Sequence, residues 1–238
     1  MGKDMLCYRA VSTPRFSLVC LPHAGGDAHA FRGWAAYLPG GVALYAVRYP
    51  GRLDRSHEPT ARTIPQLAGP IARAAAALPA PLVLFGHSMG AVVAHDVTAR
   101  LERAGCGPLA LAVSGREAPH LASGVPSPTD DDSLLAMCRS LDGVPAGLLD
   151  DAEMRELVLA PLRADTRLLN TSLGRPVRPV AASIVAYLGV DDPGCTADQI
   201  DGWRVLTTGS FRRRLLAGDH FSVLAQPAEL LSDLCAHV

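Results

Sequence analysis

"LVLFGHSMGAV", residues 82–92, places an apolar run before Gly-His-Ser-Met-Gly and a helix-compatible stretch of small residues. A G-x-S-x-G pattern between a strand and a helix is typical of a nucleophile elbow, in which a strained turn holds the serine above the sheet edge. Gly86 and Gly90 fit this turn because the strand and the helix crowd the positions two before and two after the serine. The pattern alone is weak, but its context predicts a nucleophile at Ser88; a polar residue in an ordinary turn is the alternative.

The rest of the chain alternates short apolar runs with longer amphipathic segments. Near-continuous apolar runs are typical of strands that helices cover on both faces. We predict strands at 16–21, 42–47, 82–86, 109–115, 183–189 and 213–218, and helices at about 28–38, 63–78, 89–104 and 223–237. This order predicts an α/β fold with a mostly parallel central sheet flanked by helices.

One interval, about 119–179, contains no convincing strand. Two amphipathic segments inside it, "DDSLLAMCRSL" and "DDAEMRELVLAPLRADTRLLNTSL", begin with acidic residues that suit a helix N-terminus. We therefore expect a helical insertion between two strands. It is either a further layer of packing helices or a lid over a binding site, and its apolar residues would partly pack on the core and partly line a cavity.

Length and charge limit the possible number of domains and the possible partners. A chain of 238 residues that is 49% hydrophobic can bury one substantial core, so we expect a single domain, 1–238. The 22 basic and 23 acidic residues give a net charge of -1 without a basic block, which disfavours nucleic acid as a partner.

Cysteine spacing and hydropathy indicate the compartment. The six cysteines are scattered without CxxC spacing, which favours a reducing environment over secretion or a metal site. The N-terminus lacks the apolar core of a signal peptide, and no run approaches about 18 uninterrupted apolar residues. The sequence therefore predicts a cytoplasmic protein with no membrane partner and no metal.

A serine hydroxyl needs a base to accept its proton, and the base needs an orienting carboxylate. Among the eight histidines, His220 lies between the last predicted strand and the last predicted helix, where parallel α/β folds place their sites. His87 would point away from the serine on such a turn and is assigned to packing. His220 is therefore the predicted base, and a surface loop histidine is the alternative.

The predicted acid follows the preceding strand, in "IVAYLGVDDPG". Serine, acid and histidine would then occur in the chain order of an α/β-hydrolase. We favour Asp192 because Pro193 indicates a tight turn on which a carboxylate can be held, and Asp191 is the alternative. Asp219, next to the histidine, is expected to shape the loop.

Acyl transfer also needs N–H donors for an oxyanion, normally one after the serine and one from an early loop. Met89 and Ala24 are the predicted donors, the second from "CLPHAGGDAHAF", residues 20–31. Gly25 and Gly26 would let substrate approach the backbone, or they simply form a turn into a helix. His23 is expected to shape this loop.

Five motifs together resemble the type II thioesterases that accompany modular polyketide and nonribosomal peptide synthetases. They are "PHAGG", "YPGR", "GHSMG", "GVDDP" and "GDHF", in this order, with Trp203 eleven residues after Asp192 of the fourth. The resemblance runs from about residue 16 to the end and implies an α/β-hydrolase fold with a helical lid at about 119–179. It also implies the triad Ser88, Asp192 and His220 with the amides of Ala24 and Met89.

The implied activity is hydrolysis of acyl groups from the phosphopantetheine thiol of acyl or peptidyl carrier proteins, which clears stalled assembly lines. The carrier is the expected partner, and no cofactor of the enzyme's own is needed. Arg52 of "YPGR" would attract the phosphate of the arm or pack under the loop, and Met137 would line the acyl cavity or the core. A carboxylesterase or lipase with the same triad, and a non-catalytic binding protein, are the alternatives.

Overall fold

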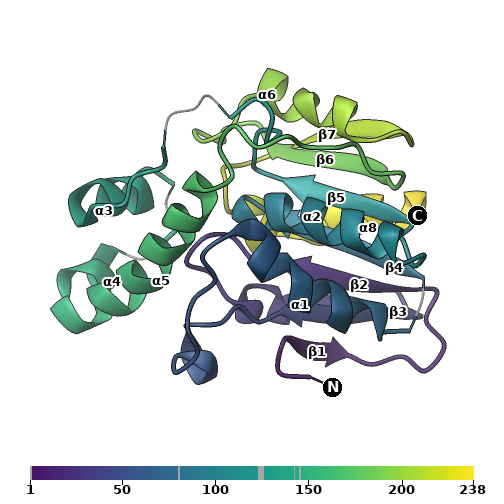
Figure 1. Ribbon diagram of the computed structural model, residues 1–238, viewed down its shortest axis with the longest axis horizontal. Helices are drawn as coiled ribbons and strands as arrows, with labels where there is room; N and C mark the ends of the chain where they lie inside the picture. Colours follow the sequence, from purple (N-terminus) through teal and green to yellow (C-terminus); the bar gives the residue numbers. More distant parts are fainter. Residues whose placement is uncertain (1, 80, 123–125, 142, 145) are drawn as a thin grey trace.

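The computed structural model describes residues 2–79, 81–122, 126–141, 143–144 and 146–238. Its centre is one seven-stranded sheet in the order β1-β3-β2-β4-β5-β6-β7 (Figure 1). The strands are β1 (Met5–Arg9), β2 (Phe16–Leu21), β3 (Val42–Val47), β4 (Leu82–His87), β5 (Ala110–Ser114), β6 (Ser183–Gly189) and β7 (Phe211–Leu216). All neighbours pair in parallel except β1 and β3. The predicted α/β fold with a mostly parallel sheet is confirmed.

The antiparallel strand β1 was not predicted. It lies at the sheet edge beside β3, and its register shifts between Cys7 and Arg9. Only Met5 in this strand is fully buried, so the segment lacks the continuous apolar run that marked the interior strands.

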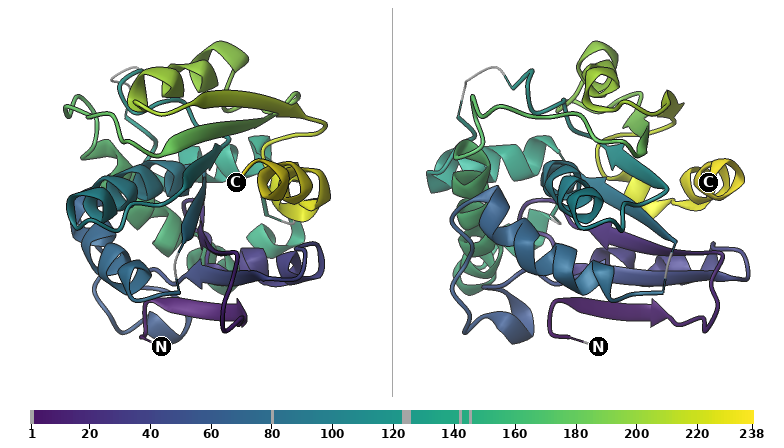
Figure 2. Two further views of the ribbon diagram at one scale, coloured as in Figure 1. Left: turned by 90° about the vertical axis from the view of Figure 1, so that its right-hand side faces the viewer. Right: turned by 45° about the vertical axis from the view of Figure 1, so that its right-hand side comes forward.

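Helices cover both faces of the sheet (Figure 2). On one face α1 (Ile64–Ala76) packs beside α2 (Met89–Arg103), and on the other lie the 3₁₀-helix η1 (Ala28–Ala36) and α8 (Ala228–His237). Successive side chains of each buried strand pack on opposite faces of the sheet. In β4, for example, Leu84 packs towards α1 and α2, and Phe85 packs towards η1. The central strands are thus buried on both sides, which explains their unbroken apolar sequences.

Two predicted helices at the ends of the chain need correction. The predicted helix 28–38 is a 3₁₀-helix, whose start the Asp27 carboxylate caps by accepting from the His29 amide. The predicted helix 223–237 is two helices, α7 (Ser222–Ala225) and α8, because Pro227 cannot continue a helix.

Three further short elements were not predicted. They are the 3₁₀-helices η2 (Leu53–Arg55) and η3 (Gly202–Leu206) and the helix α6 (Ala197–Asp201). The last two follow β6, and Trp203 in η3 is fully buried, with its indole N–H donating to the Arg116 carbonyl at 2.8 Å.

The insertion between β5 and β6 is helical, as predicted, over the described residues. It holds α3 (Asp131–Ser140), α4 (Ala146–Asp150) and α5 (Ala152–Asn170), which lie together at one end of the sheet (Figure 1). The acidic residues before α3 and α5 cap them: Asp130 accepts from the Ser133 amide, and Asp151 from the Glu153 amide, both at 2.9 Å.

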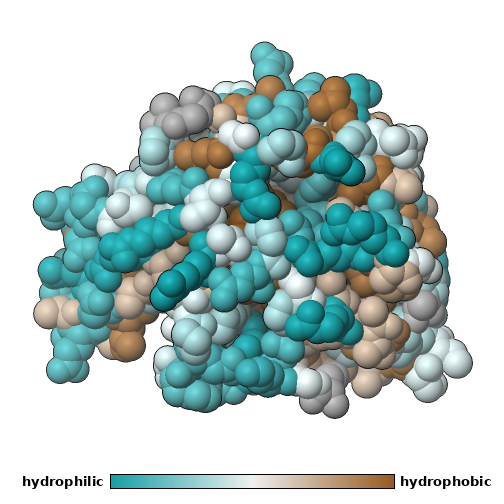
Figure 3. All heavy atoms as spheres, in the orientation of Figure 1, coloured by the Kyte–Doolittle hydropathy of each residue, from teal (hydrophilic) through white to brown (hydrophobic). Residues whose placement is uncertain are grey.

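The insertion has its own small apolar core. It contains Leu134, Cys138, Leu149, Leu159 and Leu162. On the face seen in Figure 3, the surface over α3, α4 and α5 is largely hydrophilic, although Leu157 of α5 is 69% exposed. Among the described residues, no helix is long and apolar enough to cross a membrane.

The turn from β4 into α2 leaves no room for side chains at its two glycines. A Cβ at Gly86 would lie 2.2 Å from the Gly90 carbonyl oxygen, and a Cβ at Gly90 would lie 2.2 Å from the Leu21 carbonyl oxygen. Both obstacles are backbone atoms that cannot rotate away. The elbow therefore depends on glycine at both positions, as the sequence indicated.

We predict that Gly90→Ala destabilises the protein by about 3 kcal/mol or more, because the new methyl group must displace the end of β2. The matched control is Gly33→Ala within η1, where a Cβ would meet no atom within 4 Å. That change should stabilise the helix by about 0.5–1 kcal/mol. Urea unfolding of both variants checks the pair, and equal effects would contradict the crowding argument.

Candidate active site

The predicted site residues meet at the carboxyl edge of the sheet. Ser88 follows β4, Asp192 follows β6 and His220 follows β7. In a parallel sheet these strand ends lie at one edge, so residues distant in sequence become neighbours. Ser88 and His220 line the same cavity.

Ser88 adopts a strained backbone conformation. Its φ is 52° and its ψ is −118°, and among the described residues only Leu53 shares a positive φ without being glycine. The Ser88 amide donates to the Ser114 carbonyl of β5 at 2.8 Å, and Ser88 occupies the N-cap position of α2. The side chain is partly buried and borders the cavity, which is the placement expected of a nucleophile elbow.

Asp192 holds the His220 ring. The Nδ1 of His220 and the Oδ2 of Asp192 are 2.8 Å apart, and the two side chains are only 5% and 1% exposed. The other oxygen of Asp192 accepts from the Gly194 amide at 2.8 Å, which fixes the carboxylate. Asp191 is exposed and has no such contact. The geometry selects Asp192 over Asp191 as the histidine's partner.

Asp219 shapes the turn that contains His220, as predicted. Its Oδ1 accepts from the Phe221 amide at 3.1 Å and from the Ser222 amide and hydroxyl at 3.0 and 2.7 Å. The Phe221 ring contacts both site histidines, with centroids 4.8 Å from His23 and 4.9 Å from His220. No role was predicted for this phenylalanine, whose only sequence signal was its place in "GDHF".

The predicted oxyanion donors belong to two segments that touch at the elbow. Met89 is the first residue of α2, and Ala24 lies in the loop after β2. Within the described part of the chain, neither amide donates to a protein acceptor. Free amides at a helix start favour negative charge. This arrangement is able to receive an oxyanion.

The cavity above Ser88 has a volume of about 560 Å³. The loop after β2 contributes His23, Ala24, Gly25 and Asp27, and α3 and α5 contribute Met137, Leu157, Val158, Leu162 and Thr166. Leu134 lies instead in the small core of the insertion. The apolar residues of the insertion are therefore divided between packing and lining, and Met137 is among those that line.

Two residues predicted to bind substrate do not face this cavity. Gly26 is not among its lining residues, and a Cβ there would strike the His23 ring at 2.6 Å. Gly26 is thus needed for packing against His23.

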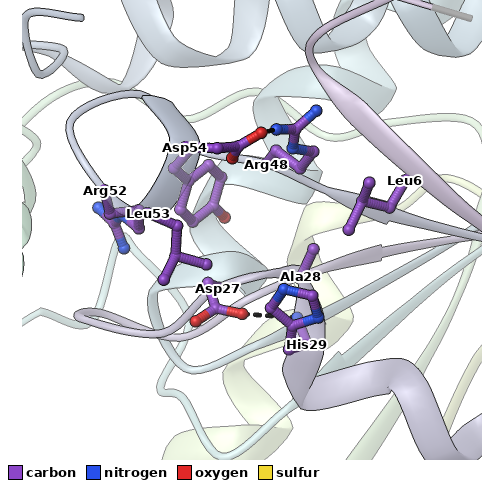
Figure 4. Close-up of a pocket in the computed structure, with 9 residues that line it drawn as sticks. Leu6, Asp27, Ala28, His29, Arg48, Arg52, Leu53 and Asp54 are labelled. Atoms are coloured by element: carbon purple, nitrogen blue, oxygen red, sulfur yellow. Dashed lines mark hydrogen bonds and ion pairs between the residues drawn. The ribbon is translucent and has the colours of Figure 1, made fainter. Parts of the chain in front are cut away.

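Arg52 also needs correction. It borders a separate pocket of about 270 Å³ (Figure 4), in which Arg48 pairs with Asp54. Its guanidinium is buried and donates to the Gly26 carbonyl at 2.6 Å and to Asp165 at 2.7 Å. The alternative, an arginine that packs under the loop, matches this geometry better than a phosphate contact does.

Sequence reasoning missed Asp165 and Arg116. Asp165 pairs with a residue 113 positions away, so no local pattern revealed it. Arg116 lines the cavity just after β5, and its place at a strand end was the one available signal.

Three histidines near the sheet are held neutral. Burial, with smaller effects of His220 and Arg52, lowers the pKa of His23 to about 4. Burial also lowers the pKa of His95 to about 4, and it lowers the pKa of His87 well below its ordinary value. The His87 ring stays close to the site, with Nδ1 3.2 Å from the Ser114 hydroxyl. None of the three suits a cationic role near neutral pH.

Over the ranges that the structure describes, no group of three or more His, Cys, Asp or Glu side chains could hold a metal ion.

Comparison with known proteins identifies the relatives of this chain. The family model described as a thioesterase domain matches residues 16–237. The chain is 38% identical over 216 residues to the "Probable cadicidin biosynthesis thioesterase" of Streptomyces griseus, covering 90% of this chain and 60% of that protein. It is 38% identical to Thioesterase PikA5 of Streptomyces venezuelae, over 93% of this chain and 80% of the relative.

Solved structures agree with the fold. RedJ, a thioesterase from the prodiginine biosynthetic pathway of Streptomyces coelicolor, superposes with a TM-score of 0.86 at 36% identity, covering 96% of this chain and 94% of RedJ. This match includes the mostly parallel sheet and its flanking helices, so the predicted α/β-hydrolase fold is confirmed.

We predict that acid destabilises the protein through its buried histidines. Between pH 6.5 and 4 the unfolded chain binds protons that buried His95 excludes, so stability falls as the pH falls through this window. His95→Leu, outside the cavity of Ser88, should remove about 2 kcal/mol of the loss between pH 7 and pH 5. Urea unfolding at both pH values measures this difference, and equal losses in variant and wild type would show that folded His95 accepts the proton.

Proposed function

We propose, because the chain belongs to the thioesterase domain family, that it is a type II thioesterase of polyketide or nonribosomal peptide biosynthesis. It hydrolyses acyl groups from the phosphopantetheine thiol of carrier proteins and so releases stalled or incorrect acyl units. The observation that carries this proposal is the Asp192–His220 contact of 2.8 Å at the rim of the cavity that also contains Ser88.

The reaction proceeds in two acyl-transfer steps. His220 accepts the proton of Ser88 as the serine oxygen attacks the thioester carbonyl, and Asp192 stabilises the imidazolium that forms. The oxyanion receives hydrogen bonds from the amides of Ala24 and Met89. His220 then gives the proton to the departing pantetheine thiolate.

Water completes the cycle. His220 takes a proton from a water molecule that attacks the acyl-serine carbonyl, and the collapse of the second tetrahedral intermediate returns the proton to Ser88 and releases the acid. The pantetheine arm belongs to the carrier protein, so the enzyme requires no cofactor of its own. We place this reaction in the cytoplasm, in keeping with the six unpaired cysteines.

The helical insertion acts as the lid of the acyl cavity. Its residues Met137, Val158 and Leu162 line the cavity that Ser88 also lines, and they supply an apolar wall. A wall of this kind excludes water from the acyl-enzyme and limits the acyl groups that fit.

A panel of carrier proteins loaded with acyl groups of different length tests the function. Intact-mass analysis after incubation with the enzyme should show loss of the acyl mass and a free phosphopantetheine thiol. Hydrolysis of free esters with no action on any loaded carrier would instead indicate a carboxylesterase. Absence of both reactions, together with no fluorophosphonate label on Ser88, would indicate a binding protein.

We predict that Ser88→Ala and His220→Ala lose turnover by about 10³-fold or more, and that Asp192→Asn loses at least about 10²-fold while remaining folded. Asp191→Asn, the matched neighbour, should retain near-normal turnover because Asp191 does not contact His220. Steady-state hydrolysis of an acyl-carrier substrate checks the set. Full activity of Asp192→Asn with loss in Asp191→Asn would reverse the assignment of the acid.

We predict that Met137→Phe shifts acyl preference, because added volume at the cavity wall excludes long chains before short ones. The ratio of kcat/KM for long against short acyl-carrier substrates should fall roughly tenfold, with labelling of Ser88 unchanged. Met154→Phe is the control, since Met154 belongs to the same insertion but does not line the cavity. Equal losses for all substrates would mean that Met137 only supports packing.

A further inference from the structure

A buried ion pair joins the insertion to the loop that carries Ala24. Asp165 of α5 accepts from two partners: Oδ1 from the Arg52 guanidinium at 2.7 Å and Oδ2 from the Gly25 amide at 2.8 Å. The two charged side chains are 7% and 5% exposed. Both carboxylate oxygens are therefore committed, one to a cation and one to the loop backbone.

Arg52 holds the same loop from the other direction. Its second terminal nitrogen donates to the Gly26 carbonyl at 2.6 Å. The guanidinium carbon lies 5.2 Å from the centre of the Tyr49 ring, a cation–π distance. Arg52 and Asp165 thus bind two consecutive residues of the loop, one at its carbonyl and one at its amide.

Tyr49 fixes the start of the loop. Its hydroxyl donates to the Pro22 carbonyl at 3.1 Å, and the whole side chain is buried. Ala24 lies between this anchor and the contacts to Gly25 and Gly26. Both Tyr49 and Arg52 belong to the "YPGR" motif, which has no role in the catalytic steps described above.

Gly25 is also enclosed sterically. It has a φ of +75°, and a Cβ there would lie 3.3 Å from the Cβ of Leu162 on α5. The insertion therefore touches the loop at Leu162 and bonds to it at Asp165. The conformation around Ala24 depends on where α5 lies.

The geometry points to Asp165 and Arg52 as positioning residues that make the oxyanion site depend on the seated insertion. The inference rests on the proposed function, in which the Ala24 amide stabilises the oxyanion. When α5 is seated, Asp165 holds the Ala24–Gly25 peptide by its N–H, and Arg52 holds the Gly26–Asp27 peptide by its carbonyl. When α5 is displaced, the Gly25 amide loses its acceptor and Arg52 its counter-ion, so the donor is no longer aligned.

Charge makes this contact specific. The carboxylate accepts on both oxygens, whereas an asparagine side chain offers one acceptor and one donor. Asp165→Asn therefore either loses the Gly25 amide or turns its NH₂ towards the Arg52 guanidinium. The effect should fall on kcat, because an oxyanion donor acts mainly in the transition state.

Asp165→Asn should lower kcat by about tenfold or more and change KM by less than about threefold. The rate at which a fluorophosphonate labels Ser88 should fall by a similar factor, because phosphonylation also places charge on an oxygen at this site. Amide exchange in the peptide covering residues 20–31 should accelerate, while exchange in β4 stays unchanged.

The double variant Arg52→Met/Asp165→Leu separates positioning from stability. Replacing a buried ion pair with apolar side chains is often neutral or stabilising, so this variant should fold. It nevertheless removes both bonds to the loop. We expect a wild-type melting temperature with kcat reduced as in Asp165→Asn.

Asp131→Asn is the matched control. Asp131 pairs with Arg163 of the same helix α5 at 2.6 Å, but it is 54% exposed and lies outside the loop contacts. This control should keep kcat within about twofold of wild type.

The inference is overturned if the folded double variant and Asp165→Asn keep wild-type kcat and labelling rates, or if Asp131→Asn loses as much as they do. Failure of the proposed function looks different, because the wild type would then hydrolyse no acyl-carrier substrate. Labelling of Ser88 and exchange in the loop would still decide the inference in that case, since neither measurement needs a thioester.

Discussion

Close packing around the β4–α2 turn is the constraint on which the rest of the site depends. Gly90 lies so near the Leu21 carbonyl that the start of α2 and the end of β2 meet without side chains between them. The loop after β2 therefore begins beside Gly90, two residues after Ser88. This single contact brings together the two segments that carry the amides of Ala24 and Met89.

The parallel sheet brings the other site residues together in a similar way. Each of the six parallel strands ends at one edge of the sheet, and the insertion leaves the sheet from that edge, after β5. The insertion consequently lies against the loops that bear the reacting groups, and its apolar side chains form one wall of their cavity. Its hydrogen bond with the loop after β2 and its ion pair with Arg52 depend on direction, whereas the wall that it gives the cavity is apolar and does not.

Much of this arrangement was predictable because its signals are local. Ser88, Asp192 and His220 each follow a strand within a short motif, and strand ends of a parallel sheet converge wherever the strands lie. The Arg52–Asp165 pair was not predictable, because either residue alone is an ordinary surface charge and only the folded chain brings them together. Likewise β1 was missed because an edge strand that is half exposed lacks an unbroken apolar run. The end of α7 was predictable from Pro227, but the sequence prediction extended one helix across this proline.

The backbone conformation of Ser88 is required for its reactivity but lowers the stability of the fold. A φ of 52° with a ψ of −118° costs a residue that has a Cβ of the order of 1–3 kcal/mol, and glycine would adopt it without that strain. Stability alone therefore favours replacing the residue on which the chemistry depends. In a lineage no longer selected for turnover, substitution of this serine by glycine would therefore increase the stability of the fold.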